Sequence, residues 1–145
     1  IVLLVLIQLL AMRQAIVRNG PMIDKATFQA VLDIKDATPD DAFILALEND
    51  SPVVLRGWYP YRRIGVPGLF NAPWSESQWQ RFFLGSHAER QAFLNQVRGP
   101  MYLFVTPYFR SYYSVFADQF LKDICFQQVT GTMLYRVTCT TIPAL

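Results

Sequence analysis

A short, almost unbroken apolar run in the first third of the chain most constrains how this sequence can fold. The run extends from Asp41 to Glu48 and reads Ala-Phe-Ile-Leu-Ala-Leu between these two acidic residues. A run of this length and composition is typical of a strand buried on both faces of a mostly parallel sheet. An amphipathic helix pattern precedes the run, and further strand and helix patterns alternate after it. The alternation predicts a three-layer α/β domain with a mainly parallel sheet and a C-terminal antiparallel hairpin.

The expected elements follow from hydrophobic periodicity and from turn and capping residues. We expect strands at residues 42–48, 53–56, 62–66 and 101–106, and a hairpin at 126–138. We expect helices at residues 24–36, 76–84, 87–97 and 112–123. Ser75 with Gln78 and Ser86 with Glu89 match capping boxes, which support the starts of the two middle helices. The stripe that recurs at helical spacing is expected to be core, and it consists of Tyr113, Phe116, Phe120, Leu121 and Ile124.

The first twelve residues, Ile1 to Met12, are apolar apart from Gln8. They are too few to span a bilayer, which takes about 20 residues. Three interpretations compete: the end of a transmembrane helix, the core of a truncated signal peptide, and a buried helix of a soluble protein. An apolar surface on all sides favours the membrane. We therefore assign residues 1–17 to the end of a transmembrane helix, projecting from or loosely packed on a small α/β domain at residues 18–145.

Length, charge and motifs limit the classes of function. The 145 residues suffice for one domain with one core. The net charge is +2, with no Lys/Arg run and no recognisable nucleic-acid motif, so we expect no nucleic-acid partner. The sequence contains no Gly-x-Gly-x-x-Gly, P-loop or Gly-x-Ser-x-Gly motif. Glu48-Asn49-Asp50 also puts negative charge where a nucleotide fold would bind phosphate, so we expect no cofactor.

The segment from Arg56 to Gly68 has the strongest functional composition. It combines three aromatic residues and three arginines with two prolines and three glycines. Flat rings can stack on sugars, and guanidinium groups can clamp a phosphate. The alternative is an aromatic loop that packs on the domain or lies at a membrane interface. The candidate ligand-binding residues are Trp58, Tyr59, Tyr61, Arg62 and Arg63.

The single histidine, His87, lies at the start of an expected helix beside Glu89 and Arg90. We interpret it as a surface residue. With no second histidine and no nearby nucleophile, neither a histidine-based triad nor a histidine-containing metal cluster can be built. We therefore predict no catalytic residue and no metal site.

The two cysteines, Cys125 and Cys139, flank the expected hairpin. If its turn centres near Gly131, the two side chains lie within cross-strand reach. Two alternatives remain open: a disulfide, which suits an oxidising compartment, or two free thiols. Neither cysteine belongs to a Cys-x-x-Cys pair, so the sequence does not support a zinc site.

The order of these features resembles a known family. An apolar helix end and an Asn-Gly-Pro break are followed by "DATPDDAFILALE", "RGWYPYRRIGVPG", "MYLFVTP" and "FQQVTGTMLYRV". This order is similar to that of the C-terminal soluble domain of bacterial polytopic membrane glycosyltransferases of the GT-C type, which are related to dolichyl-phosphate-mannose protein mannosyltransferases. The resemblance covers most of residues 8–145. It implies a polyprenyl-phosphate sugar donor and an acceptor outside the cytoplasm. The family's catalytic carboxylates lie in a membrane portion that this sequence does not contain, so no catalytic residue carries over.

The resemblance and the local charges disagree about the side of the membrane. Arg13, Arg18 and Lys25 follow the apolar run, and the positive-inside rule would place the domain in the cytoplasm. The family implies an extracytoplasmic domain. We follow the resemblance, because it covers far more of the chain.

Three hypotheses about function result. The first is a non-catalytic accessory domain of a membrane glycosyltransferase that uses lipid-linked sugars, with the membrane (through residues 1–17) and the rest of the parent protein as partners. The second is a module that binds a sugar or lipid phosphate, such as a polyprenyl-phosphate sugar, through Trp58–Arg63. The third is a stand-alone soluble α/β protein.

Overall fold

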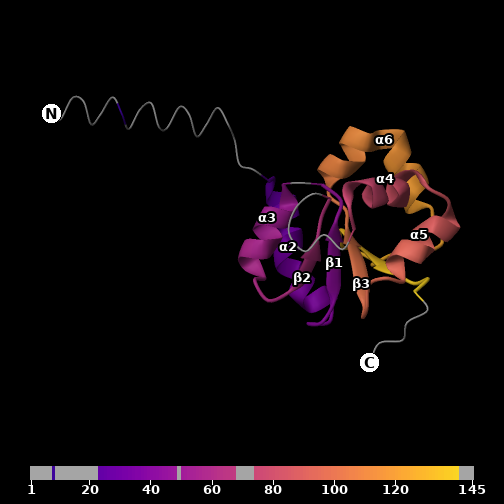
Figure 1. Cartoon of the computed structure of the whole chain (residues 1–145). Coiled ribbons are helices and arrows are strands. Elements are labelled where there is room, and N and C mark those ends of the chain that lie inside the picture. Colours follow the sequence, from indigo (N-terminus) through magenta and orange to yellow (C-terminus); the bar gives the residue numbers. More distant parts are fainter. Residues whose placement is uncertain (1–7, 9–22, 49, 68–73, 141–145) are drawn as a thin grey trace.

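A computed structural model describes residues 8, 23–48, 50–67 and 74–140. The described helices are α2 (Lys25–Ala37), α3 (Ser51–Trp58), α4 (Glu76–Leu84), α5 (His87–Leu94) and α6 (Pro107–Leu121). The strands are β1 (Phe43–Ala46), β2 (Arg63–Gly65), β3 (Met101–Phe104), β4 (Phe126–Gln128) and β5 (Leu134–Val137). The expected α/β class is confirmed (Figure 1).

The five strands form one mixed sheet in the order β2-β1-β3-β5-β4. β1 pairs in parallel with β2 and β3, whereas β5 pairs antiparallel with β3 and β4. The expected hairpin is present, but it joins the main sheet through β5. The expectation of a mainly parallel sheet is therefore corrected to a mixed one, because the hairpin supplies two of the five strands.

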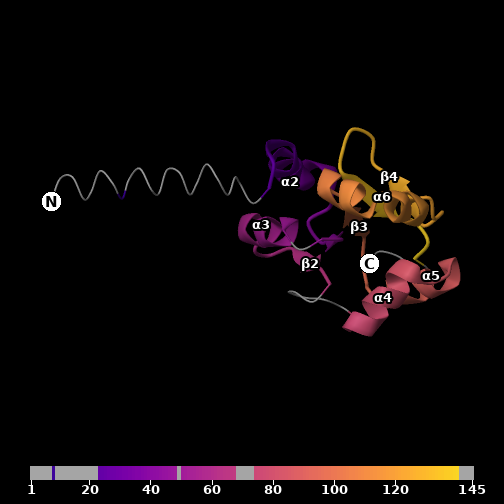
Figure 2. The same cartoon turned by 90° about the horizontal axis from the view of Figure 1, so that it is seen from above.

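Helices cover both faces of the sheet (Figures 1 and 2). Successive side chains of β1 point to opposite faces. Ile44 packs in the core beneath α2 and α3, and Leu45 packs in the core beneath α4, α5 and α6. All four residues of β1 are buried, as the apolar run predicted.

Residues 53–56, expected to form a strand, belong to helix α3. Pro52 lies in the first turn of this helix, a position that proline tolerates. The carboxylate of Glu48 accepts the backbone N–H groups of Asp50 and Ser51 at 2.8 and 3.0 Å, which satisfies two donors at the helix start. A helix is required here because β1 and β2 are parallel, and parallel neighbours need a crossover connection.

Helix boundaries differ at two other places. α6 begins at Pro107 rather than near residue 112, because Thr106 caps it by accepting the backbone N–H of Phe109 at 3.1 Å. α5 ends at Leu94 rather than at residue 97. The capping boxes at Ser75 and Ser86 are both present, as expected.

The helix expected at residues 1–17 lies outside the described residues, apart from Gln8. Among the residues that the structure describes, no helix has the length and apolar character needed to cross a membrane.

Candidate functional site

The sheet topology creates a crevice at the carboxyl ends of β1 and β3. The chain leaves β1 through α3 on one face of the sheet and leaves β3 through α6 on the other face. Two neighbouring parallel strands whose connections diverge in this way form a topological switch point, where ligands of open α/β sheets usually bind. A ligand-binding site is therefore expected in this crevice.

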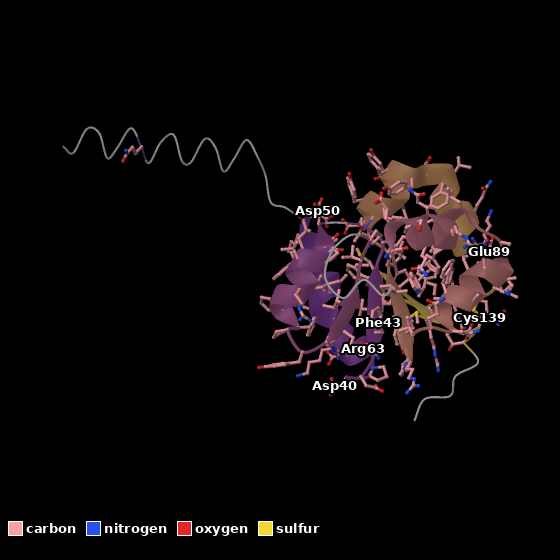
Figure 3. All side chains as sticks on the ribbon, in the orientation of Figure 1. Asp40, Phe43, Asp50, Arg63, Glu89 and Cys139 are labelled. Carbon is pink, nitrogen blue, oxygen red and sulfur yellow. A yellow bond between two sulfur atoms is a disulfide. The ribbon has the colours of Figure 1, made fainter. Side chains whose placement is uncertain are left out.

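A cleft of about 590 Å³ lies at this edge. We call it the aromatic cleft. Its lining combines residues after β1, residues of α4 and the first half of α6: Leu47, Glu48, Asp50, Pro67, Gln80, Phe83, Leu84, Tyr108, Phe109, Tyr112, Tyr113 and Phe116. Figure 3 labels Asp50 at this edge of the domain. The shape and composition suit a small-molecule site, which is typically concave and lined by apolar and aromatic side chains.

Three tyrosines near the start of α6 form an exposed group of rings. The ring of Tyr112 stacks on Tyr108 at 5.5 Å and meets the edge of Tyr113 at 4.9 Å. Residues 108 and 112 are one helical turn apart, so their side chains lie on the same face. All three rings are at least partly exposed, which leaves aromatic surface available to a ligand.

Ser114 separates the tyrosine-rich half of α6 from its core-packed half. Its φ of 27° is positive, which is unfavourable for a residue other than glycine. After this kink, Ala117 and Phe120 turn into the core. The exposed tyrosines of α6 therefore all precede the kink, although Phe109 before it is buried in the core and Phe116 after it lines the cleft.

Two carboxylates contribute polar character to the cleft. Glu48 is buried and is held by the N–H groups that it accepts at the start of α3, whereas Asp50 is exposed. Desolvation, with the nearby Tyr112 hydroxyl and the Asp50 carboxylate, raises the pKa of Tyr108. Flat rings, hydroxyl donors and carboxylate acceptors together suit a neutral ligand that carries several hydroxyl groups.

The predicted ligand-binding segment lies at the amino edge of the sheet and runs from the last residue of α3, Trp58, through a loop to the first residue of β2, Arg63. Four of its five candidate residues line a second hollow of about 530 Å³: Trp58, Tyr59, Tyr61 and Arg62. Trp58 is half-exposed and meets the edge of Phe28 at 5.5 Å. The hydroxyl of Tyr59 donates to the carbonyl oxygens of Val31 and Leu32 at 2.8 and 2.9 Å, which ties the loop to α2. Tyr61 is 98% exposed.

The two arginines of this segment are committed to contacts within the domain. Arg62 is only 7% exposed and donates to Thr38, to the carbonyl oxygen of Pro39 at 3.0 Å and to Asp40 at 3.1 Å. Arg63 donates to the carbonyl oxygen of Arg98 at 2.8 Å, and its guanidinium lies 4.8 Å from the ring centre of Phe43. Figure 3 labels Arg63, Phe43 and Asp40 close together at this edge. These contacts favour a structural role for both guanidinium groups.

Replacing Arg62 with alanine should therefore affect stability more than binding. The change leaves the acceptors on the 38–40 loop without their buried partner, which typically costs about 1–3 kcal/mol. Trp58→Ala is the matched control, since it removes an exposed side chain of the same hollow and should cost less. Urea unfolding of both variants measures the difference. Equal losses of stability would contradict the structural role of Arg62.

A polar cluster that the sequence did not predict joins α5 to the loop after α6. Nδ1 of His87 lies 2.8 Å from one oxygen of Asp123, and Nε of Arg90 donates to the other at 2.6 Å. The expectation that His87 is a plain surface residue is therefore incomplete, because its ring is only partly exposed and bonds to a buried carboxylate. Burial would raise the pKa of Asp123, but the backbone N–H of Cys125 and the side chains of Arg90 and His87 lower it below its usual value.

The two cysteines form a disulfide, with their Cα atoms 4.8 Å apart. The donor atoms of His87, Asp123 and Cys125 lie within 4.8 Å of one another, a spacing that could hold a metal ion. However, the sulfur of Cys125 is bonded to Cys139, so it offers no thiolate ligand. The disulfide closes the base of the hairpin, and the bonds of His87 and Arg90 to Asp123 fasten α5 to the loop that leads into it.

Comparison of the chain with protein-family models, with curated proteins and with solved structures finds no match. Function is therefore inferred from the geometry of this α/β domain. The sequence offered one signal for the aromatic cleft: residues 108, 112 and 113 are tyrosines rather than phenylalanines, and they follow a buried strand. The stripe was expected to be core, which holds for Phe120 but is wrong for Tyr113 and Ile124, which are both exposed.

Proposed function

We propose that this chain is a non-catalytic accessory domain of a membrane glycosyltransferase that uses lipid-linked sugars, and that its aromatic cleft binds the sugar. The fold is compatible with the sequence resemblance, and the disulfide fits an extracytoplasmic location, where thiols are oxidised. The observation that carries the proposal is the cleft itself, where exposed tyrosine rings lie beside two carboxylates at the carboxyl edge of the sheet.

The chemistry of the cleft distinguishes a sugar from other ligands. The apolar face of a pyranose can stack on a tyrosine ring, while its hydroxyl groups donate to carboxylates and accept from phenols. Glu48 and Asp50 disfavour a phosphate inside the cleft through like-charge repulsion. For a polyprenyl-phosphate sugar, the sugar would enter and the phosphate would stay outside.

The segment Trp58–Arg63 supports a second candidate, the same class of ligand bound at the amino edge of the sheet. Trp58 and Tyr61 are exposed there and line one hollow. This candidate is weaker, because the guanidinium of Arg62 is already engaged by its own loop and has limited capacity for a phosphate.

Substituting Tyr112 should distinguish the two sites. In the full chain, Tyr112→Ala should weaken binding of a polyprenyl-phosphate hexose roughly threefold to tenfold, the effect of losing about one aromatic stacking contact. Tyr112→Phe keeps the ring and should retain most of the affinity. Trp58→Ala and Tyr61→Ala remove exposed rings at the other edge and serve as matched controls. Isothermal titration of the four variants and the unsubstituted chain gives the affinities.

The outcomes separate the hypotheses. Loss of affinity in Trp58→Ala with none in Tyr112→Ala would move the site to the amino edge. No binding of the lipid-linked hexose by the unsubstituted chain would remove both candidate sites. Binding that is equal in all variants would show that neither set of rings contacts the ligand.

A further inference from the structure

The carboxyl edge of the sheet carries large hydrophobic side chains that point outward. Leu84 at the end of α4 is 77% exposed, and Tyr112 and Val115 on α6 are each 68% exposed. Tyr108, which stacks on Tyr112, is half-exposed. Leu84, Tyr108 and Tyr112 line the aromatic cleft, and Val115 follows Tyr112 by three positions on α6. We call these four residues the aromatic rim. Exposed hydrophobic side chains that gather in one place usually mark an interaction surface.

The residues that lead into α2 lie at the same edge of the sheet. Ile23 and Asp24, which lead into α2, line a small groove together with Asp50, Thr106 and Tyr108. The entry of the chain into the domain therefore lies beside the rim. The apolar run ends at Met12. The ten residues 13–22 can span at most about 35 Å even when fully extended, so the apolar run is tethered within that distance of Ile23.

We propose that the aromatic rim rests on the headgroup region of a phospholipid bilayer. Tyrosine suits this position, because its ring is apolar and its hydroxyl can stay hydrated among headgroups. Leu84 and Val115 can insert their short apolar side chains slightly deeper. A second protein could also cover such a surface. The bilayer is favoured because Ile23, which lies beside Tyr108 of the rim, is only eleven positions after the end of the apolar run at Met12.

Charge at this edge specifies the kind of lipid surface. The rim residues are uncharged, and the nearby exposed groups Asp24 and Asp50 are acidic. Lys25, next to Asp24, and Arg110, between Tyr108 and Tyr112 on α6, are exposed bases. Because charges of both signs lie around an uncharged rim, the rim fits a zwitterionic surface such as phosphatidylcholine. Docking in this orientation opens the aromatic cleft at the membrane surface, where a lipid-linked sugar is available. The contact itself does not depend on sugar binding.

Position-specific labelling tests the contact. Both cysteines of the chain are in the disulfide, so one added cysteine can be labelled alone. Val115→Cys and Leu84→Cys place an environment-sensitive fluorophore on the rim, and Tyr61→Cys places it on a fully exposed side chain at the other edge. The full chain is reconstituted in phosphatidylcholine nanodiscs that contain doxyl-labelled lipid. Quenching at positions 84 and 115 should exceed that at position 61 severalfold.

Several results would overturn the proposal. These are a lack of quenching at both rim positions, equal quenching at positions 61 and 115, or failure of the full chain to copurify with the nanodiscs. Stronger quenching in anionic than in zwitterionic nanodiscs would overturn the assigned lipid class. Because the readout contains no sugar, it can succeed even if the lipid-linked hexose does not bind, and the two proposals can fail separately.

Discussion

Replacing both cysteines with alanine should lower the free energy of unfolding by about 3 kcal/mol. The reason is that a disulfide closing a loop of about 15 residues lowers the conformational entropy of the unfolded chain, and the variant regains that entropy. The Cys125–Cys139 bridge spans 14 residues and encloses the β4–β5 hairpin. Cys125 is fully buried, so alanine is preferable to serine, which would add a buried hydroxyl group. Trp74 and Trp79 are buried, and their fluorescence can follow urea unfolding.

Reductant supplies the control for this prediction. A dithiol should lower the unfolding midpoint of the unsubstituted chain to that of the Cys125→Ala/Cys139→Ala variant and leave the variant unchanged. If reduction moves neither protein, the bridge contributes nothing to stability. Because Gln91 donates to the carbonyl oxygen of Cys139 at 3.0 Å, loss of the bridge should loosen the contact between the hairpin and α5 as well.

The parts of the fold that sequence predicted well are those specified by local signals. The buried strand within residues 42–48 could be predicted from its apolar composition alone. The helices that begin after Ser75 and Ser86 could be predicted from their capping boxes alone. The hairpin needed its alternation and Gly131, whose positive φ of 76° suits the turn. In each case the decisive residues lie within a few positions of one another.

The errors arose where distant residues decide the structure. Val53-Val54-Leu55 is apolar and contains two β-branched residues, so by itself it favours a strand. It is helical because β1 and β2 pair in parallel and because Glu48 satisfies the start of α3. The pairing of β5 with β3, which makes the sheet mixed, likewise depends on residues about 30 positions apart and has no local signature.

The candidate site shows the same division. The ring and guanidinium density of Trp58–Arg63 is visible in sequence, but the burial of Arg62 depends on the loop at residues 38–40. The aromatic cleft combines Asp50 with Tyr112, more than 60 positions away, and its position follows from strand order alone. Sequence therefore identified ring-rich segments and could not tell which of them faces a cleft.

Asp123→Asn should lower the free energy of unfolding by about 3 kcal/mol, because it leaves the charge of Arg90 without its buried partner. The Asp123 side chain is only 2% exposed and that of Arg90 14%, so solvent can replace little of the lost interaction. Arg90 also donates to the carbonyl oxygen of Gly85, which keeps the guanidinium in place after the change. Asp118→Asn, an exposed change of equal charge on α6, is the matched control and should have little effect.

The lowered pKa of Asp123 adds a pH dependence whose sign is fixed. The pKa of Asp123 is lower in the folded than in the unfolded state, so its ionised form stabilises the fold at pH values above the ordinary pKa of about 3.9. This stabilisation is lost as the pH falls through the folded-state pKa. The unsubstituted chain and Asp118→Asn should therefore lose stability together as the pH is lowered from about 5, while Asp123→Asn, which has no proton to gain at this position, should change less. Urea unfolding of the three proteins at a series of pH values measures this difference. Parallel pH profiles for all three would mean that Asp123 has no favourable ionic interaction in the folded state, and that α5 packs on the hairpin through the hydrophobic core and the Gln91 hydrogen bond without it.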